Sequence, residues 1–410
     1  MIARAGLFFL LAVAAYAQTA LPEDVLRLAR IKNAMRRHLD GMPNYTCLQT
    51  VERYHRPPRA KKEELIDILR LEVAYVEGRE LFAWPGSSHF EDRELKDLIS
   101  TGAFSTGSFA LHAKALFLGE GARFMFRGEE VFAGKPAWRY DYETAQVYSG
   151  YSIRNPTRQI SARVAYHGSF WADKSNYDLI RMTIQTDSIP EEIELESTAD
   201  QLDYQIVKIG DLDALLPKQS ELHIFDLRHY ESINRIRLSR CKQYSTVSSI
   251  SFEDPEAIAA KAAKVDKVIE IPKELEIELA LTQEIDHTNN AVGDPIEATL
   301  RRDVKDGKNI LLPKGSKATG RIMRFEHDTL DYSVYNITLA FDELTGEGWR
   351  APLNLRLLRT EPNYPPPSGV AGRSRTNRPV IVPRTGPNGF LIFAVKLKLS
   401  RGFTTIWQTQ

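Results

Sequence analysis

The feature that most constrains the fold of this chain is a strict alternation of apolar and polar residues within residues 293–324. Ile296, Ala298 and Leu300 point one way, and the polar residues between them point the other way. After a polar turn at residues 306–308, Ala318 and Ile322 again share one face. A period of two with Gly and Pro at the joints is typical of hairpins in a half-buried antiparallel sheet.

The same alternation recurs along most of the chain and predicts a mainly β protein with a few helices. It places about ten strands of one large, curved antiparallel sheet before residue 253, at 45–54, 69–75, 81–84, 122–126, 138–142, 162–171, 180–186, 201–209, 221–225 and 233–251. A second set predicts a small β-barrel, at 275–281, 296–301, 318–322, 335–341, 353–357, 390–399 and 404–407. Closing a small sheet into a barrel would remove its exposed edges.

Two segments ahead of and inside the first sheet have helical spacing. Residues 21–39 carry Val25, Leu28, Ile31, Met35 and Leu39 on one stripe, which predicts an amphipathic helix that packs on the sheet. Residues 95–119 predict a second helix, interrupted by glycine.

The length of 410 residues indicates two domains and smaller pieces. We predict a half-barrel over residues 18–253, a helical linker over 254–270, and the small barrel over 271–410. Alanine and lysine favour a helix in the linker. A loop rich in Pro and Gly at 360–389 interrupts the barrel, and its Arg373, Arg375 and Arg378 make it basic. These arginines either contact an anionic partner or belong to a solvated insertion.

The N-terminus has the pattern of a signal peptide. Arg4 precedes an apolar run at residues 6–15, and Ala15 and Ala17 fit the small-residue cleavage rule. The alternative is a buried first helix. The sequence therefore predicts signal peptide 1–17 and a mature chain that is periplasmic or secreted. We expect no transmembrane segment, because no later run reaches about 18 apolar residues.

Cys47 and Cys241 are the two cysteines of the chain, and each lies in a strand-like run. Because an exported chain meets an oxidising compartment, we predict a disulfide between the first and last strands of the first sheet. The alternative is a pair of buried free thiols. A redox or metal role would need a nearby partner such as C-x-x-C, which this sequence lacks.

Charge and motifs argue against several functions. The 54 basic and 54 acidic residues cancel, so bulk electrostatic binding of nucleic acid is not expected. No zinc-protease, nucleophile-elbow or phosphate-loop motif is present, and we predict no enzyme activity, no cofactor and no metal. His223 and His229 flank Asp226, but surface positions on strands are the simpler reading. A pair of glycosidase carboxylates has no positive support.

Trp138, Tyr140 and Tyr142 alternate on one strand, so they share one face, where they either line an apolar hollow or fill the core. Residues 168–181, GSFWADKSNYDLIR, resemble the strand pair of LolA/LolB-like envelope proteins. The resemblance covers residues 22–253. It implies a half-barrel with an internal helix, whose concave face holds lipid chains, lipoproteins or sensory peptides. Phe170 and Trp171 of this motif join the three aromatic residues as candidate ligand-binding residues.

The C-terminal part is similar to the barrel of TrbI-like type IV secretion components. The similarity rests on VGDPIEA at residues 292–298 and LPKGSKATGR at 312–321. It implies docking to an envelope assembly. A channel-forming role is not expected, because the chain lacks the membrane helix and the long hydrophobic segment of those components.

These observations lead to two hypotheses. The first is an exported, non-enzymatic envelope protein that binds an apolar ligand or a lipid-modified partner in the half-barrel and docks through the terminal barrel. The alternative is a ligand-free structural or interaction scaffold. An envelope hydrolase is a distant third.

Overall fold

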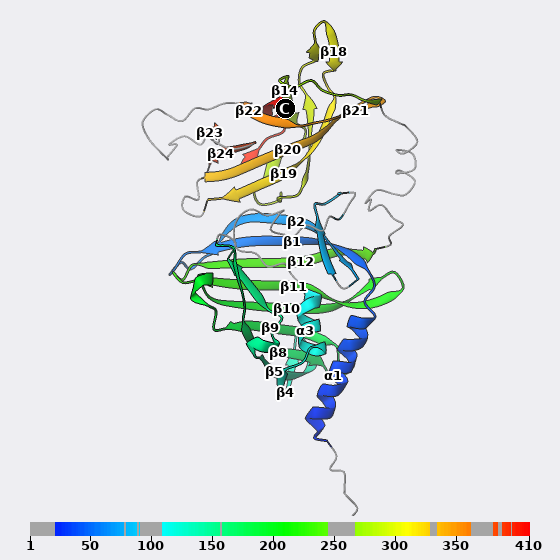
Figure 1. Cartoon of the computed structure of the whole chain (residues 1–410), viewed down its shortest axis with the longest axis vertical. Helices are drawn as coiled ribbons and strands as arrows, with labels where there is room; N and C mark the ends of the chain where they lie inside the picture. Colours follow the sequence, from blue (N-terminus) through cyan, green and yellow to red (C-terminus); the bar gives the residue numbers. More distant parts are fainter. Residues whose placement is uncertain are drawn as a thin grey trace, which may run out of the picture.

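The computed structural model describes residues 21–77, 79–87, 90, 109–155, 158–244, 267–328, 334–361, 380–383, 388–394 and 396–410. Two ten-stranded sheets dominate the chain (Figure 1). The strands of the first sheet come from residues 45–243 and those of the second from residues 267–409. The predicted fold class, mainly β with a curved half-barrel sheet and an N-terminal helix, is confirmed.

The first sheet has the order β3-β2-β1-β12-β11-β10-β9-β8-β5-β4, and its neighbouring strands are antiparallel. The bounds are β1 (Tyr45–Arg56), β2 (Glu64–Val76), β3 (Arg79–Ala83), β4 (Ala122–Phe132), β5 (Lys135–Thr144), β8 (Ala165–Asp173), β9 (Leu179–Asp187), β10 (Leu195–Ile209), β11 (Leu212–Asp226) and β12 (Glu231–Gln243). Strands β6 (Ser152–Asn155) and β7 (Ile160–Arg163) form a separate hairpin. Two short 3-10 helices are η1 (Gln146–Tyr148), between β5 and β6, and η2 (Glu191–Ile193), between β9 and β10.

Helices α1 (Glu23–Asp40) and α3 (Phe109–Leu118) pack on one face of this sheet, which we call the inner face. Glu23 and Asp24 in the first turn of α1, and Arg37 and His38 in its last turn, complement the helix dipole. The predicted apolar stripe is buried at its middle, through Ile31 and Met35, whereas its first member is exposed. Residues 95–108 of the second predicted helix lie outside the described residues.

The disulfide between Cys47 and Cys241 is present, as predicted. It joins β1 to β12, the first and last strands of the sheet in sequence, which lie side by side in space. The bond therefore links two strands that are 194 residues apart in the chain. No free cysteine remains.

The second sheet has the order β13-β21-β20-β19-β16-β14-β26-β22, and β24 joins β20 to β23. The bounds are β13 (Lys267–Val268), β14 (Glu276–Leu281), β16 (Pro295–Leu300), β19 (Lys317–His327), β20 (Val334–Gly346), β21 (Trp349–Pro352), β22 (Leu355–Glu361), β23 (Val380–Pro383), β24 (Gly389–Phe393) and β26 (Thr404–Thr409). Two small pairs are β15 (Ile285–Asp286) with β25 (Lys398–Leu399), and β17 (Val304–Asp306) with β18 (Asn309–Leu312).

The alternating stretch of residues 293–324 folds as the sequence predicts. Ile296, Ala298 and Leu300 of β16 are buried on one face, and Ala318 and Ile322 of β19 lie in the same core. The predicted strand at 390–399 is wrong in its extent. It ends at Phe393, where its pairing with β20 stops, and its buried side chains are Phe390 and Ile392.

The predicted linker helix is wrong at its C-terminal end. Lys267 and Val268 form β13 and pair in parallel with Trp349 and Arg350, because a free edge of the second sheet accepts them there. Residues 254–266 lie outside the described residues, as do residues 1–20 with the predicted cleavage site, and Arg373, Arg375 and Arg378. None of the helices among the described residues has the length and apolar character that a membrane crossing requires.

The two sheets meet at β2, which lies on the side of the first sheet that faces the second sheet (Figure 1). Beyond the reach of the short strand β3, Leu69 forms an isolated parallel bridge with Val292. The N–H of Val292 donates to Ile68 O at 2.7 Å, and the N–H of Arg70 donates to Val292 O at 2.8 Å. A 2.5 Å ion pair joins Arg70 to Asp294. The second sheet therefore covers an edge of β2 that β3 leaves unpaired.

Candidate functional site

The inner face of the first sheet carries an aromatic cluster. The alternation of β5 points Trp138, Tyr140 and Tyr142 inward, and all three are buried. Phe170 of β8 is in register with Tyr140, and their rings stack 5.3 Å apart. The structure therefore brings together four of the five residues predicted to bind a ligand.

Trp171, the fifth predicted residue, lies on the opposite face, which we call the outer face. It follows Phe170 directly, and successive residues of a strand point to opposite sides of a sheet. Its ring stacks on Phe132 at 4.9 Å and lies under the Arg139 guanidinium. The structure thus places Trp171 away from the other four side chains, among outer-face residues.

Helix α1 covers one end of the aromatic cluster with long basic side chains. The Arg27 guanidinium lies 4.6 Å from the ring centre of Phe126 and 5.1 Å from that of Trp138. Burial, together with the nearby charge of Arg36, lowers the pKa of Lys32, whose ammonium group lies 4.4 Å from the Phe124 ring. Such cation–π contacts favour a cation over an aromatic face that is partly removed from water.

Helix α3 covers the centre of the cluster. Phe117 meets Phe170 edge-on at 5.1 Å and stacks on Phe124 at 6.5 Å. The helix has the sequence FALHAKALFL, and its Ala113, Leu116 and Phe117 are buried, whereas Lys114 and Ala115 are exposed. His112 is half-buried and stacks on Tyr151, and its removal from water lowers its pKa to about 4. His112 is therefore a neutral group at ordinary pH.

A polar region adjoins the aromatic cluster on the same face and is centred on Asp200. This residue of β10 is 6% exposed and is in register with Leu222 and Ile184, both in the core. Its Oδ1 atom has no hydrogen-bond partner among the described residues. Burial raises the pKa of Asp200 to about 7, so its side chain changes charge near neutral pH.

Phenols surround this carboxyl group. Burial, with a contribution from the charge of Asp200, raises the pKa of Tyr151 to about 12 and raises that of Tyr204 still further. The Tyr142 hydroxyl donates to the backbone oxygen of Thr183 at 2.7 Å. Its ring reaches across β8 only because Gly168 lies between, where a Cβ would come within 2.9 Å of the phenol oxygen. The inner face thus offers an aromatic part and a hydrogen-bonding part side by side.

Sequence reasoning missed Asp200, although a signal was present. Thr198, Leu202 and Tyr204 alternate with polar residues, so the strand pattern extends over residues 198–204 and places Asp200 on the core side. The predicted strand began at Gln201 and left this residue out.

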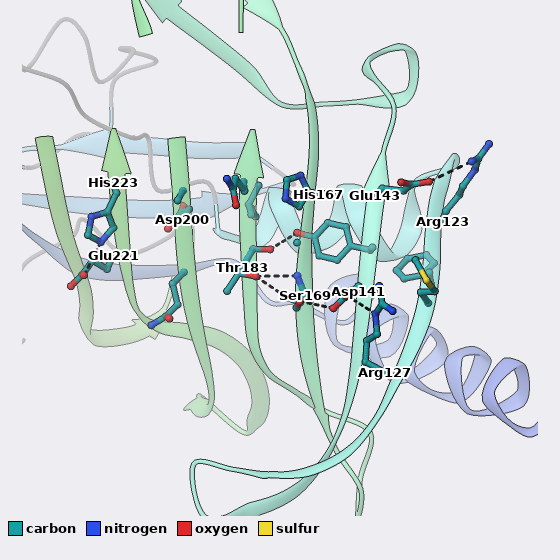
Figure 2. A pocket seen from close by; sticks show the side chains of 18 residues that line it. Arg123, Arg127, Asp141, Glu143, His167, Ser169, Thr183, Asp200, Glu221 and His223 are labelled. Atoms are coloured by element: carbon teal, nitrogen blue, oxygen red, sulfur yellow. Dashed lines mark hydrogen bonds and ion pairs between the residues drawn. The ribbon is translucent and has the colours of Figure 1, made fainter. Parts of the chain in front are cut away.

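The outer face of the same sheet carries a hollow of about 850 Å³, which we call the outer hollow. Figure 2 shows the side chains that line it, with the helices behind the sheet. It crosses strands β4, β5, β8, β9, β10 and β11. Its lining includes Arg123, Arg127, Asp141, Glu143, His167, Ser169, Thr183, Gln185, Ala199, Gln201, Glu221 and His223.

Most charged groups in the outer hollow are paired with one another. Arg127 contacts Asp141 at 2.6 Å, and Arg123 contacts Glu143 at 3.4 Å. Burial alone would raise the pKa of Asp141, but hydrogen bonds from Ser169 and Arg127 lower it overall. His223 bridges Glu221 and Glu231. Asp141 is thus held ionised, as a hydrogen-bond acceptor.

No family model matches the chain, and no curated protein matches it. Several solved structures are similar to it, among them the following three. A structure described as an outer membrane lipoprotein-sorting protein domain, from Vibrio parahaemolyticus, has 11% identity over 58% of this chain and 97% of its own, with a TM-score of 0.29. A LolA superfamily protein from Nitrosomonas europaea has 11% identity over 56% and 96%, with a TM-score of 0.27. MucB in complex with MucA(peri) has 12% identity over 94% and 93%, with a TM-score of 0.18.

The second of these structures is a member of the LolA superfamily, the family that residues 22–253 resemble. The three TM-scores are low, and the fold of this chain is defined by its own strand pairing. The resemblance of the C-terminal part to TrbI-like barrels stays a prediction.

Proposed function

We propose that this chain is an exported, non-enzymatic cell-envelope protein that binds an apolar, lipid-like molecule on the inner face of its first sheet. The lipid of a modified partner protein would fit the same surface. The observation that carries the proposal is the packing of α3. Its Phe117 rests on Phe124 and Phe170 through ring contacts, which are the contacts that an acyl chain would make in its place.

Replacing α3 by a lipid would exchange one apolar surface for another. The hydrophobic effect is non-directional, so a hydrocarbon chain gains from the aromatic face much as Leu116 and Phe117 do. The polar region adds direction. Asp200 and the hydroxyl of Ser220, which likewise has no hydrogen-bond partner among the described residues, offer groups to the polar end of such a ligand.

The compartment follows from the disulfide and the predicted signal peptide. A disulfide between Cys47 and Cys241 suits an oxidising environment outside the cytoplasm. We therefore place the mature chain in the periplasm or outside the cell. We also propose that the second sheet docks to an envelope assembly. This part of the proposal rests on the TrbI-like sequence pattern alone.

A ligand-free scaffold is the second candidate, and one observation favours it. Trp138, Tyr140, Tyr142 and Phe170 are all buried by the chain's own side chains. The two candidates differ in whether α3 ever yields its place to another molecule.

Lipid binding by the whole mature chain tests the proposal. We expect cis-parinaric acid to bind with a saturable rise in fluorescence and to be displaced by palmitate. The variant Phe117→Ala should bind the probe at least about tenfold more tightly. The substitution weakens the packing of α3 on the sheet, so less free energy is needed for a ligand to displace the helix. The measurement is a fluorescence titration at fixed pH and salt.

Phe341→Ala is the matched control. Phe341 is buried against Trp407 in the second sheet, so its removal costs comparable stability away from the inner face. Its affinity for the probe should equal that of the unaltered chain. Absence of saturable binding in all three proteins would leave the scaffold as the function. Weaker binding by Phe117→Ala alone would show that the ligand does not replace α3.

A further inference from the structure

The outer hollow has an ordered floor that the proposed lipid site does not use. Strand pairing places Gln201 opposite both Thr183 and Glu221, while Asp141 is opposite Ser169. The N–H of Ser169 donates to the Thr183 hydroxyl at 3.0 Å, which links the two sets. One row of side chains therefore crosses five neighbouring strands.

A second row lies beside the first. Gln185 is opposite both His167 and Ala199, with Glu143 and His223 at the two ends. Neighbouring strands are about 4.8 Å apart, so a row of five strands is about 19 Å long. This length suits a short chain molecule lying across the strands.

The hollow arises from side-chain size. Ser169, Thr183 and Ala199 are short and lie in its middle, whereas Arg123 and Arg127 stand at its β4 side (Figure 2). Long residues around short ones leave a trough on a face that would otherwise be level. The arrangement is built into the strand sequences.

The residues that line the outer hollow favour a ligand without net charge. Its cations and carboxylates already contact one another, as Arg127 does Asp141 and Arg123 does Glu143. Burial alone would raise the pKa of Glu221, but hydrogen bonds from Arg235 and His223 lower it overall, so it stays ionised. A charged polymer would have to break these pairs, and a lipid chain would leave the polar lining unsatisfied.

Two amides in the floor remain available. Gln185 and Gln201 lie on adjacent strands, and neither side chain has a hydrogen-bond partner among the described residues. An amide group donates through N–H and accepts through C=O. Neighbouring hydroxyl groups of a sugar ring likewise donate and accept, so two spaced amides beside ionised carboxylates suit a run of hydroxyls.

We infer that the outer hollow is a binding site for a neutral oligosaccharide. The sugar chain lies across β5, β8, β9, β10 and β11, with its hydroxyls on the Gln185 and Gln201 amides and on the Asp141 carboxylate. This site is on the opposite face of the sheet from the proposed lipid site, and it does not depend on that proposal.

Calorimetric titration of the whole mature chain tests the inference. The probes are chitotetraose and cellotetraose, which are neutral, and tetragalacturonic acid, which is a chain of similar length with a carboxylate on every ring. We expect at least one neutral probe to bind, and the acidic probe to bind more weakly. The double variant Gln185→Ala, Gln201→Ala should bind the neutral probe about tenfold more weakly, since hydrogen bonds to two amides are lost.

Gln205→Ala is the control, because Gln205 lies on β10 and shares the outer face with Gln201, but outside the hollow. It should bind the probes as the unaltered chain does. The inference is overturned if neither neutral probe binds, if tetragalacturonic acid binds more tightly than both, or if the double variant binds unchanged. Circular dichroism of both variants shows whether they fold.

Discussion

Loss of the Cys47–Cys241 bond should lower the free energy of unfolding of the chain by about 5 kcal/mol. The bond closes a loop of 194 residues between β1 and β12, and loop-closure entropy in the unfolded chain predicts a loss of about this size. The figure is an upper value, because the reduced chain keeps some structure when unfolded.

Urea unfolding of the variant Cys47→Ala, Cys241→Ala measures this effect. The unaltered chain in the presence of a reductant is the control, since it loses the bond but keeps both side chains. Both should unfold at similar, lower urea concentrations than the oxidised chain. Equal midpoints for the oxidised and reduced chains would contradict a stabilising role for the bond.

Asp200→Asn should make the protein more stable above pH 7 and leave its stability near pH 4 unchanged. The native pKa of Asp200 is raised from 3.8 to about 7, so the folded chain holds a proton that the unfolded chain releases. Stability therefore falls as the pH rises from about 4 to about 7 and then levels off. This shift in pKa corresponds to roughly 4 kcal/mol of unfolding free energy. The unaltered chain loses this stability as Asp200 ionises, whereas the variant with a neutral asparagine keeps it.

Thermal unfolding between pH 4 and pH 8 checks the sign. Asp203→Asn is the matched control, because Asp203 lies on the same strand but on the outer face, paired with Arg181. Burial alone would raise its pKa, yet hydrogen bonds from Arg181 and Gln219 lower it. Its contribution is thus present above the unfolded pKa and is lost in acid. The control should therefore be less stable than the unaltered chain at pH 8, and a parallel pH profile for both variants would refute the assignment.

Much of the fold is predictable from local pattern, since alternation along a strand reports which side chains are buried. This is why Ile296, Ala298 and Leu300 lie where we predict, and why Trp138, Tyr140 and Phe170 share one face. The pairing of Cys47 with Cys241 is predictable because the sequence places both in strands and predicts that the chain is exported. Trp171 shows the limit, because a motif names residues without naming the face that each one takes.

The remaining features depend on contacts between strands that are distant in sequence. The outer hollow exists because short residues of β8, β9 and β10 come into register, and no single strand reveals that register. The raised pKa of Asp200 arises from burial by several strands and helices. The strand predicted at 390–399 ends at Phe393, which is the last residue of this segment that pairs with β20, and the apolar pattern of the sequence does not report that pairing.

The parallel bridge between Leu69 and Val292 bears on how the first sheet behaves by itself. A half-chain that ends before residue 267 would expose the backbone donors and acceptors of Ile68 and Arg70, which Val292 now engages. Uncovered strand edges pair with each other. Such a half-chain should form dimers or larger species that light scattering detects, while the whole mature chain stays smaller at the same concentration. The second sheet would then act as an intramolecular chaperone that prevents self-association of the first sheet once both have folded.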